Sequence, residues 1–277
     1  MQPSILITGT SSGIGLATAN ILKQRGYRVF ASARKAADVE KLKMAGFEAI
    51  QLDVNDDASI NQALTQILAL TNGTLDALFN NAGFLQAGAV EDLSRDIDKA
   101  QFETNFFGPM ALTRRVLPIM RKQGHGRIIQ NSSILGIVTI PYCGAYNASK
   151  FALEGYSNTL RQELRGTHIH VSIINPGPIQ SALRENAYQH YENTLAREQS
   201  GWHHAAYEKM KESYFKPSKL DRARSEGPEA VAKKVIQALE SKRPKAHYYV
   251  GTPAHILAVF RRILPDSLLD WVVSKVR

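Results

Sequence analysis

Short apolar segments alternate along the chain with longer stretches in which apolar residues recur every three or four positions. The short segments have the length of buried strands, and the longer ones have the period of amphipathic helices. Regular alternation of strand and helix is typical of right-handed crossovers between parallel strands. The predicted strands are residues 5–8, 28–33, 48–54, 75–80, 127–131, 170–174 and 247–250. We therefore predict an α/β fold with a doubly wound parallel sheet of seven strands and helices on both faces.

Two of the helical stretches show the period clearly. One carries apolar residues at positions 60, 64 and 67, and the other at positions 231, 235 and 238. The second is preceded by Gly227-Pro228-Glu229, which is a typical start signal for a helix.

Two segments depart from the alternation. Residues 179–226 contain no predicted strand and are rich in Tyr, His and Lys, and a long excursion inside a compact domain usually has a function. Residues 252–277 predict two short helices separated near Pro265, with Leu268, Val272 and Val276 on one face of the second. We predict one domain over residues 1–251, with residues 179–226 as a lid within it, and an amphipathic C-terminal extension over residues 252–277.

The composition is typical of a soluble globular protein, with 44% hydrophobic and 21% charged residues among 277, which excludes a disordered chain. The single cysteine, Cys143, excludes an internal disulfide framework and a multi-cysteine metal site. No apolar run reaches the about 18 residues that a bilayer-spanning helix needs, and the first residues lack the features of a signal peptide. We therefore expect a cytoplasmic protein without a transmembrane segment. The unusual value is the net charge of +9, which is compatible with nucleic acid, an anionic membrane or neither.

Glycines follow the first predicted strand, in Thr8-Gly9-Thr10-Ser11-Ser12-Gly13-Ile14-Gly15, and a helical stretch comes next. Glycine at such a junction lets the backbone turn tightly and approach a pyrophosphate, whose charge the helix N-terminus favours. The spacing Gly-x3-Gly-x-Gly differs from the usual dinucleotide fingerprint. The strand–turn–helix context predicts a nucleotide site, and an ordinary glycine-rich turn is the alternative.

The end of the second strand indicates which nucleotide binds. An acidic residue there hydrogen-bonds a free ribose 2′-hydroxyl, whereas Arg accommodates a 2′-phosphate. Arg34 and Lys35 end this strand, and no acidic residue occurs before Asp38. The two cations predict NADP(H), and two solvated charges at a strand end are the alternative.

Polar residues also follow later strands, at Asn80-Asn81-Ala82-Gly83, Asn131-Ser132-Ser133 and Asn175-Pro176-Gly177. Ligands of open α/β sheets bind at these carboxyl ends of the strands. Tyr146 and Lys150 begin a helical stretch and share one face of it. The ammonium group is expected to lower the pKa of Tyr146 and make it a general acid/base, with a serine hydroxyl beside it to polarise a carbonyl. Taken alone, Tyr-x3-Lys is also common as a surface pair.

In this order, Thr8-Gly-x3-Gly-x-Gly, Asn80-Asn-Ala-Gly, Ser133, Tyr146-x3-Lys150 and Pro176-Gly177 resemble the motifs of the short-chain dehydrogenase/reductase family. Ser133 lies thirteen residues before Tyr146, which is the spacing of that family. The resemblance covers roughly residues 4–251 and is greatest for the branch of retinol and 17β-hydroxysteroid dehydrogenase-like enzymes. It implies a Rossmann fold.

The resemblance implies a role for each matching residue. Tyr146 transfers the proton, Lys150 lowers its pKa and holds the nicotinamide ribose, and Asn105 helps to hold a relay water. Ser133 orients the substrate oxygen, so that Ser133 and Tyr146 also bind substrate, and the spacing disfavours Ser132 for this role. The implied cofactor-binding residues are Gly9, Ser11, Ser12, Gly13, Ile14, Gly15, Arg34, Lys35, Asp53, Val54, Asn81, Ala82, Gly83, Tyr146, Lys150, Pro176, Gly177, Ile179 and Ser181.

The expected function is an NADP(H)-dependent oxidoreductase that interconverts an alcohol and an aldehyde or ketone by hydride transfer. An epimerase or dehydratase on the same scaffold is the runner-up. A non-catalytic NADP-binding regulator is disfavoured, because such proteins commonly lose the Tyr or the Lys and both are present here. Relatives form homodimers or homotetramers through the helices around residues 101–122 and 146–165, and we expect the same.

The predicted lid is rich in aromatic residues, namely Tyr188, Tyr191, Trp202, Tyr207, Tyr214 and Phe215. They fit a lid over an apolar substrate, such as a retinoid, a steroid or a fatty aldehyde, or a small aromatic core that only folds the segment. Tyr142 and Cys143 are candidates for the pocket wall, although buried thiols are usually inert packing. His203-His204 have no His or Cys at a ligand spacing, so we expect no metal.

The net charge is unevenly distributed. Residues 209–224 carry +4 and residues 242–277 carry +5, which leaves the remainder neutral. This distribution disfavours binding of nucleic acid. It fits a basic rim at the substrate entrance or a peripheral contact of the extension with a membrane, while packing on the protein is the commonest fate of an amphipathic helix.

Overall fold

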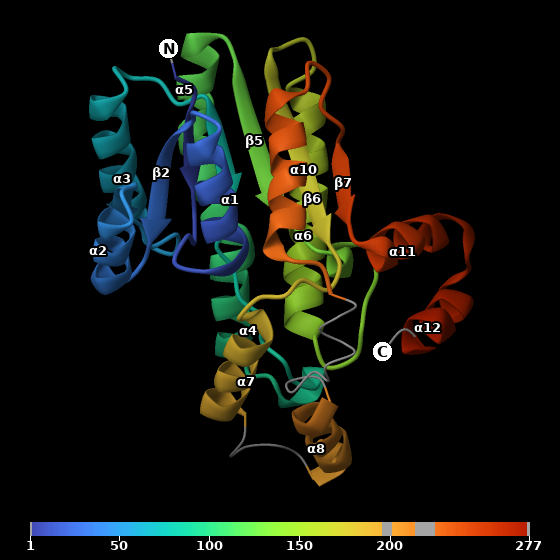
Figure 1. Cartoon of the computed structure of the whole chain (residues 1–277). Helices are drawn as coiled ribbons and strands as arrows, with labels where there is room; N and C mark the ends of the chain where they lie inside the picture. Colours follow the sequence, from blue (N-terminus) through green and yellow to red (C-terminus); the bar gives the residue numbers. More distant parts are fainter. Residues whose placement is uncertain (1, 196–200, 214–224, 276–277) are drawn as a thin grey trace.

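Seven parallel strands form one sheet in the order β3-β2-β1-β4-β5-β6-β7 (Figure 1). The structure, a computed structural model, describes residues 2–195, 201–213 and 225–275. The sheet confirms the predicted seven-stranded doubly wound fold. The strands are β1 (Ser4–Ile7), β2 (Arg28–Ala33), β3 (Glu48–Gln51), β4 (Ala77–Asn80), β5 (Gly126–Asn131), β6 (Ile169–Pro176) and β7 (His247–Val250).

The α-helices are α1 (Gly13–Gln24), α2 (Ala36–Met44), α3 (Asp57–Leu70), α4 (Arg95–Phe102), α5 (Gly108–Gln123), α6 (Gly144–Glu163), α7 (Leu183–Thr194), α8 (His204–Ser213), α10 (Pro228–Glu240), α11 (Thr252–Ile263) and α12 (Asp266–Lys275). Four short turns complete the described elements: η1 (Val90–Asp92), η2 (Glu103–Phe107), η3 (Ile134–Gly136) and η4 (Gly201–His203). The predicted start of α10 at Gly227-Pro228-Glu229 is confirmed, since Gly227 is its N-cap residue.

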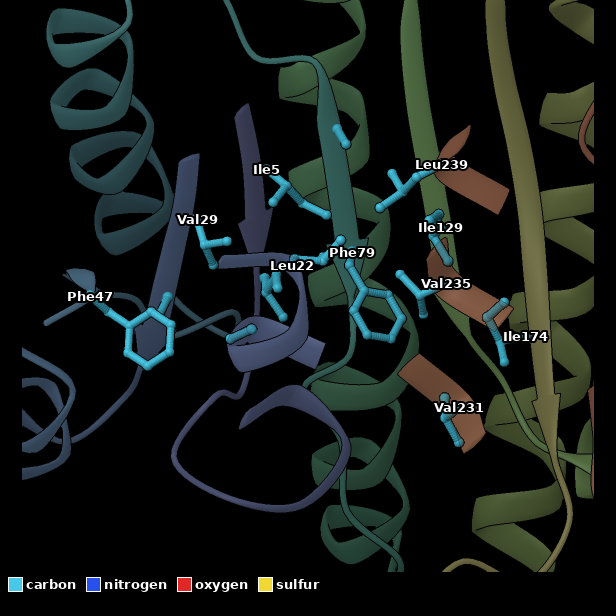
Figure 2. Packing of buried hydrophobic residues seen from close by; sticks show 14 of the residues in the cluster. Ile5, Leu22, Val29, Phe47, Phe79, Ile129, Ile174, Val231, Val235 and Leu239 are labelled. Atoms are coloured by element: carbon cyan, nitrogen blue, oxygen red, sulfur yellow. The ribbon is translucent and has the colours of Figure 1, made fainter. Parts of the chain in front are cut away.

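Alternate strand residues face opposite helical layers, because successive side chains of a strand point to opposite faces of the sheet. Ile5 and Ile7 of β1 belong to the buried cluster that includes residues of α1 and α10, as Figure 2 shows around Leu22 and Val235. Leu6 lies in the cluster formed with α3, α5 and α6. The sheet is therefore covered on both faces, which leaves the edge at the strand ends for a ligand.

Residues 179–226 leave the sheet after β6 and contain α7, η4 and α8. The base of this segment is pinned by a β-bridge between Ile179 and Glu226, where Gln180 N donates to Glu226 O over 2.8 Å. Tyr191 and Tyr207 are completely buried, whereas Trp202 is 88% exposed. Tyr214, Phe215 and the basic residues at positions 216, 219, 222 and 224 lie outside the described residues.

The C-terminal extension forms two helices separated at Pro265, as predicted, and projects beyond β7 (Figure 1). The apolar face expected for the second helix packs only in part, because Val272 is partly buried while Leu268 is 44% exposed. Leu269 and Val273 are the buried residues, and they pack with Ile134, Val138 and α11. Val276 lies outside the described residues. Among those that are described, no helix has the length and apolar character needed to span a membrane.

Candidate functional site

A cleft of about 810 Å³ opens at the carboxyl ends of the strands. It lies where the strand order changes direction between β1 and β4, the usual ligand position in such sheets. Its lining brings together the residues predicted for the nucleotide and for catalysis. Of the predicted positions, Gly9, Ser11, Ser12, Gly13, Ile14, Arg34, Asp53, Val54, Asn81, Ala82, Gly83, Ser133, Tyr146, Lys150, Pro176, Gly177, Ile179 and Ser181 line the cleft.

The glycine-rich turn is held against the segment after β4. Thr8 Oγ1 accepts hydrogen bonds from the backbone nitrogens of Asn81 and Ala82, both over 2.9 Å. Gly15 does not line the cleft, but a Cβ there would collide with the carbonyl oxygen of Gly9, so only glycine lets α1 start this close to the turn. The residues of the sequence motif therefore pack together, and Gly15 permits the close contact between α1 and Gly9 without lining the cleft itself.

The start of α1 suits a phosphate group. Its N-cap residue, Ser12, makes no side-chain capping hydrogen bond, and its first turn carries no acidic residue. Backbone N–H groups at an uncapped helix start carry a partial positive charge and bind anions. These features fit the pyrophosphate of a dinucleotide.

The two cations after β2 occupy different positions. Arg34 lines the cleft, and its backbone oxygen accepts a hydrogen bond from Gln51 over 3.1 Å. Lys35 is exposed at the N-cap position of α2 and is not part of the lining. Of the two, Arg34 is the one that lines the cleft.

Ser133 and Tyr146 meet at the cleft wall. Ser133 is the N-cap residue of η3, where its hydroxyl accepts from Leu135 N over 3.1 Å. Burial raises the pKa of Tyr146 to about 12, and a hydrogen bond with Ser133 lowers it to a smaller extent. The net direction of this pKa is therefore upward and not the expected lowering, because the phenol is only 6% exposed and the Lys150 ammonium lies 5.7 Å from its ring centroid.

Lys150 lines the cleft, is largely buried, and donates to the backbone oxygen of Asn131 over 2.8 Å. Burial lowers the pKa of Lys150 to about 8, and the negative charge of Glu154 acts in the opposite direction. The ammonium is thus poised close to its own titration range.

Asn105 lies below the cleft and is not part of its lining. It belongs to a π-helical turn, η2, of the kind often found at functional sites. Its side-chain amide makes three hydrogen bonds. Oδ1 accepts from Phe84 N over 3.1 Å, and Nδ2 donates to Phe84 O over 3.0 Å and to Ser149 Oγ over 3.2 Å. Asn105 therefore holds the chain after Asn81-Ala82-Gly83 against α6.

A polar stripe on α7 was not predicted from the sequence. Asn186, His190 and Thr194 repeat every four residues and line the cleft, while Ala187, Tyr191 and Leu195 form the neighbouring buried stripe. The His190 ring stacks on Phe84, which also lines the cleft, with ring centroids 4.6 Å apart. Burial lowers the pKa of His190, as does the charge of Arg34. The helical spacing within residues 183–195 was the signal that could have identified these residues.

The aromatic residues of the lid form a small core instead of the cleft wall. Tyr191 and Tyr207 pack with Tyr142 and Cys143, and the Tyr191 and Tyr207 ring centroids are 5.4 Å apart. The assignment of Tyr142 and Cys143 to the pocket wall is therefore corrected, because neither residue lines the cleft and both pack in the buried cluster with the lid. Of the two interpretations of the aromatic residues, the structure favours the core for Tyr188, Tyr191 and Tyr207, whereas Trp202 is exposed.

The histidine ring of His203 contacts a carboxylate and a phenol. Its Nε2 lies 2.5 Å from Glu91 Oε1, and its Nδ1 lies 3.4 Å from Tyr142 OH. Among the described residues, no three His, Cys, Asp or Glu side chains gather in an arrangement that could hold a metal ion.

The sequence matches a family model described as short chain dehydrogenase over residues 3–192. It is 41% identical over 274 residues to the uncharacterized oxidoreductase YbbO of Escherichia coli K12, covering 99% of this chain and 95% of that protein. It is 42% identical over 188 residues to 3-ketodihydrosphingosine reductase of Bacteroides thetaiotaomicron, covering 67% and 68%. Over 278 residues it is 32% identical to dehydrogenase/reductase SDR family member 7B of Bos taurus, covering 95% and 78%.

Solved structures share the fold. A short-chain dehydrogenase from Streptomyces avermitilis has a TM-score of 0.77 at 30% identity, covering 99% of this chain and 94% of that one. Actinorhodin polyketide ketoreductase with NADPH has a TM-score of 0.73 at 27% identity, covering 91% and 95%. A Burkholderia phymatum family member in complex with NAD has a TM-score of 0.77 at 26% identity, covering 94% and 92%. Similar structures thus include complexes with either nicotinamide dinucleotide.

Proposed function

The chain belongs to the short-chain dehydrogenase/reductase family, and on this premise we propose that it is an NADP(H)-dependent oxidoreductase that interconverts an alcohol and an aldehyde or ketone. One observation carries the proposal: Ser133, Tyr146 and Lys150 line the same cleft as the phosphate-binding turn. Bound NADPH supplies a hydride to the substrate carbon in the reducing direction.

The chain's own residues supply the proton and the orientation. Ser133 donates a hydrogen bond to the substrate oxygen, and Tyr146 gives its phenolic proton to that oxygen as negative charge develops. With a pKa raised to about 12 by burial, Tyr146 keeps its proton at neutral pH and is suited to act as the acid in reduction. Lys150, as an ammonium group, stabilises the phenolate that remains.

Arg34 supports the choice of NADP(H) over NAD(H). It lines the cleft at the end of β2. The acidic residue nearest in sequence, Asp38, forms an ion pair with Lys41 over 3.3 Å within α2. A guanidinium group at this position binds a 2′-phosphate, and a carboxylate would be needed to favour the free hydroxyl.

An apolar substrate, of the retinoid, steroid or fatty-aldehyde kind, is the class we propose. Phe84, Ile97 and Leu183 give the cleft apolar surface next to the reacting groups. The name of one relative, 3-ketodihydrosphingosine reductase, refers to a ketone reduction of this type. The polar stripe of α7 faces the same cleft, so the bound molecules meet polar groups from the lid.

The test is consumption of NADPH, followed by its absorbance, against a panel of apolar aldehydes and ketones, with NADH run in parallel. We expect turnover with NADPH for members of the panel and a weaker reaction with NADH. Binding of NADPH without turnover of any carbonyl, and without oxidation of the matching alcohols by NADP⁺, would contradict the proposal in favour of a regulator.

A further inference from the structure

A buried carboxylate lies one helical turn after Lys150, and the proposed reaction gives it no role. Glu154 is on α6, and 8% of its side chain is exposed. A charged group at such a position is costly unless it is paired or hydrogen-bonded. Its partners therefore indicate why it is there.

The first partner connects Glu154 to the catalytic serine. Asn175 of β6 is fully buried, and its Nδ2 donates to Glu154 Oε1 over 2.5 Å. The same nitrogen donates to the backbone oxygen of Ser133 over 3.2 Å. The carboxylate thus fixes an amide that also holds the main chain of Ser133.

The second carboxylate oxygen faces two further groups. His247 Nδ1 lies 3.6 Å from Glu154 Oε2 and 3.2 Å from Asn175 Oδ1. Ser132 Oγ and Glu154 Oε2 are both buried without a well-formed hydrogen bond in the described part of the chain. Burial raises the pKa of Glu154, and Ser132 is close enough to lower it. Gly136 closes this pocket, because a Cβ there would lie 2.7 Å from Ser132 Oγ and 3.0 Å from Glu154 Cγ.

The charged groups around the carboxylate come from three elements. Lys150 lies on α6, as does Arg161, which acts on His247 of β7 together with Arg262 of α11. Burial lowers the pKa of His247, and the two arginines lower it further, so this ring is neutral at working pH. Tyr249 of β7 has its pKa raised by burial and, to a smaller extent, by Glu154. Glu154 is therefore the negative charge that acts on Lys150, four residues before it on the same side of α6.

The two groups act on each other in opposite directions. Burial raises the pKa of Glu154 to about 6, and Lys150 is among the groups that lower it. Burial lowers the pKa of Lys150 to about 8, and Glu154 raises it. Between these values the carboxylate and the ammonium coexist, and each favours the charged form of the other.

We propose that Glu154 is a positioning residue for the reaction: its buried carboxylate is the counter-charge placed one helical turn after Lys150 and, through Asn175, it holds the main chain of Ser133. The proposal rests on the proposed oxidoreductase function, because Lys150 and Ser133 act through that chemistry. Residues that do not touch the substrate but hold the reacting groups in position commonly have large effects on activity.

The central experiment compares Glu154→Gln with wild type over a range of pH. The amide has nearly the same shape, its oxygen accepts from Asn175, and its nitrogen can donate to Ser132 Oγ, so the variant is expected to fold. Glu163→Gln on the same helix is the matched control, because Glu163 is exposed. Without the carboxylate the pKa of Lys150 falls, so the alkaline limb of kcat moves to lower pH by about one unit.

The expected kcat of Glu154→Gln is close to wild type near about pH 6 and roughly tenfold lower above about pH 9. Glu163→Gln follows wild type throughout. Glu154→Asp, which keeps the charge on a shorter side chain, restores part of the alkaline limb. A profile that coincides with wild type, or one lowered by the same factor at every pH, would overturn the proposal and leave a structural role.

A second readout measures Lys150 without turnover. Competitive acetylation followed by mass spectrometry gives the pH at which the Lys150 amine becomes reactive. We expect this pH to be about one unit lower in Glu154→Gln and unchanged in Glu163→Gln. If wild type turns over no carbonyl compound, the proposed function fails, whereas an unshifted Lys150 titration refutes the positioning role on its own.

Discussion

Tyr146 is the side chain on which the proposed chemistry depends most directly. Tyr146→Phe removes the transferable proton and leaves the buried ring in place, so the fold is retained. We expect kcat to fall by about 10²–10⁴-fold, the typical contribution of a positioned acid. The Kd for NADPH, measured by fluorescence titration, is expected to change little.

A matched control is Tyr156→Phe, on the same helix, since Tyr156 packs against Phe106 with centroids 6.2 Å apart and is not among the residues that line the cleft. Its turnover is expected to match wild type. Turnover of Tyr146→Phe within a few-fold of wild type would remove Tyr146 as the acid.

Arg34 gives a prediction about the cofactor. Arg34→Ala removes a charge-assisted contact worth about 1.5–3 kcal/mol, so the Kd for NADPH is expected to rise by roughly tenfold to a hundredfold while the Kd for NADH stays nearly constant. Lys35→Ala is the control, because Lys35 is exposed beside Arg34 but is not part of the cleft lining. Equal weakening of both cofactors, or of neither, would refute selection by Arg34.

Several residues predicted for the site lie together in the cleft because each follows a strand. Gly9, Asn81, Ser133 and Gly177 all come just after a strand, and the sheet brings the strand ends together. The direction of the pKa of Tyr146 could not be predicted in the same way. It is set by burial under the lid, which depends on contacts between segments distant in sequence.

Among the elements, α7 shows that a sequence pattern can indicate a helix without indicating its packing partner. The spacing of residues 187, 191 and 195 predicts a helix, but it does not reveal which partner the apolar stripe packs against. The partner is the chain after β4, including Leu85 and Ala89. The same applies to α12, where two apolar pairs were available and only the three-dimensional neighbours select Leu269 and Val273.

The attachment of α8 can be tested at one hydroxyl group. Tyr207 OH donates to Asp92 Oδ2 over 2.5 Å and accepts from Ala89 N over 2.9 Å. Tyr207→Phe leaves the buried Ala89 N–H without its acceptor, which costs about 1–3 kcal/mol. We expect faster hydrogen exchange over α8 and a higher KM, with kcat less affected.

Trp202→Phe is the control for this prediction, because Trp202 belongs to the same segment and is 88% exposed. It should exchange at the wild-type rate. Unchanged exchange over α8 in Tyr207→Phe would show that the hydroxyl group does not hold the lid.

For the molecule as a whole, alternation of strands and helices was enough to predict the sheet, because parallel strands require crossovers. The surface was less predictable, since exposure depends on which faces remain uncovered. α11 packs through Ala254 and Leu257 but leaves Ile256, Val259 and Ile263 exposed on its other side. Packing of the extension on the protein is thus observed, and contact of this outer face with a membrane stays a prediction.

The expected homo-oligomer concerns α5 and α6, which both contribute to the buried cluster on one face of the sheet. Phe107, which directly precedes α5, is 42% exposed, and Phe151 of α6 is 37% exposed. The Phe107 ring packs against Phe106, with ring centroids 5.1 Å apart. On α6, no atom lies within 4 Å of the position that a Cβ of Gly155 would take. Burying large apolar side chains contributes about 1.5–3 kcal/mol each, so a second copy is expected to cover them.

Light scattering after size-exclusion chromatography is expected to give a dimer or tetramer for wild type and a smaller species for Phe151→Glu, because a charge at the centre of an apolar interface is left unpaired. Met44→Glu is the control, since Met44 on α2 is 81% exposed and lies outside the proposed interface. A monomeric wild type, or a Phe151→Glu variant of unchanged mass, would show that these helices are not the interface.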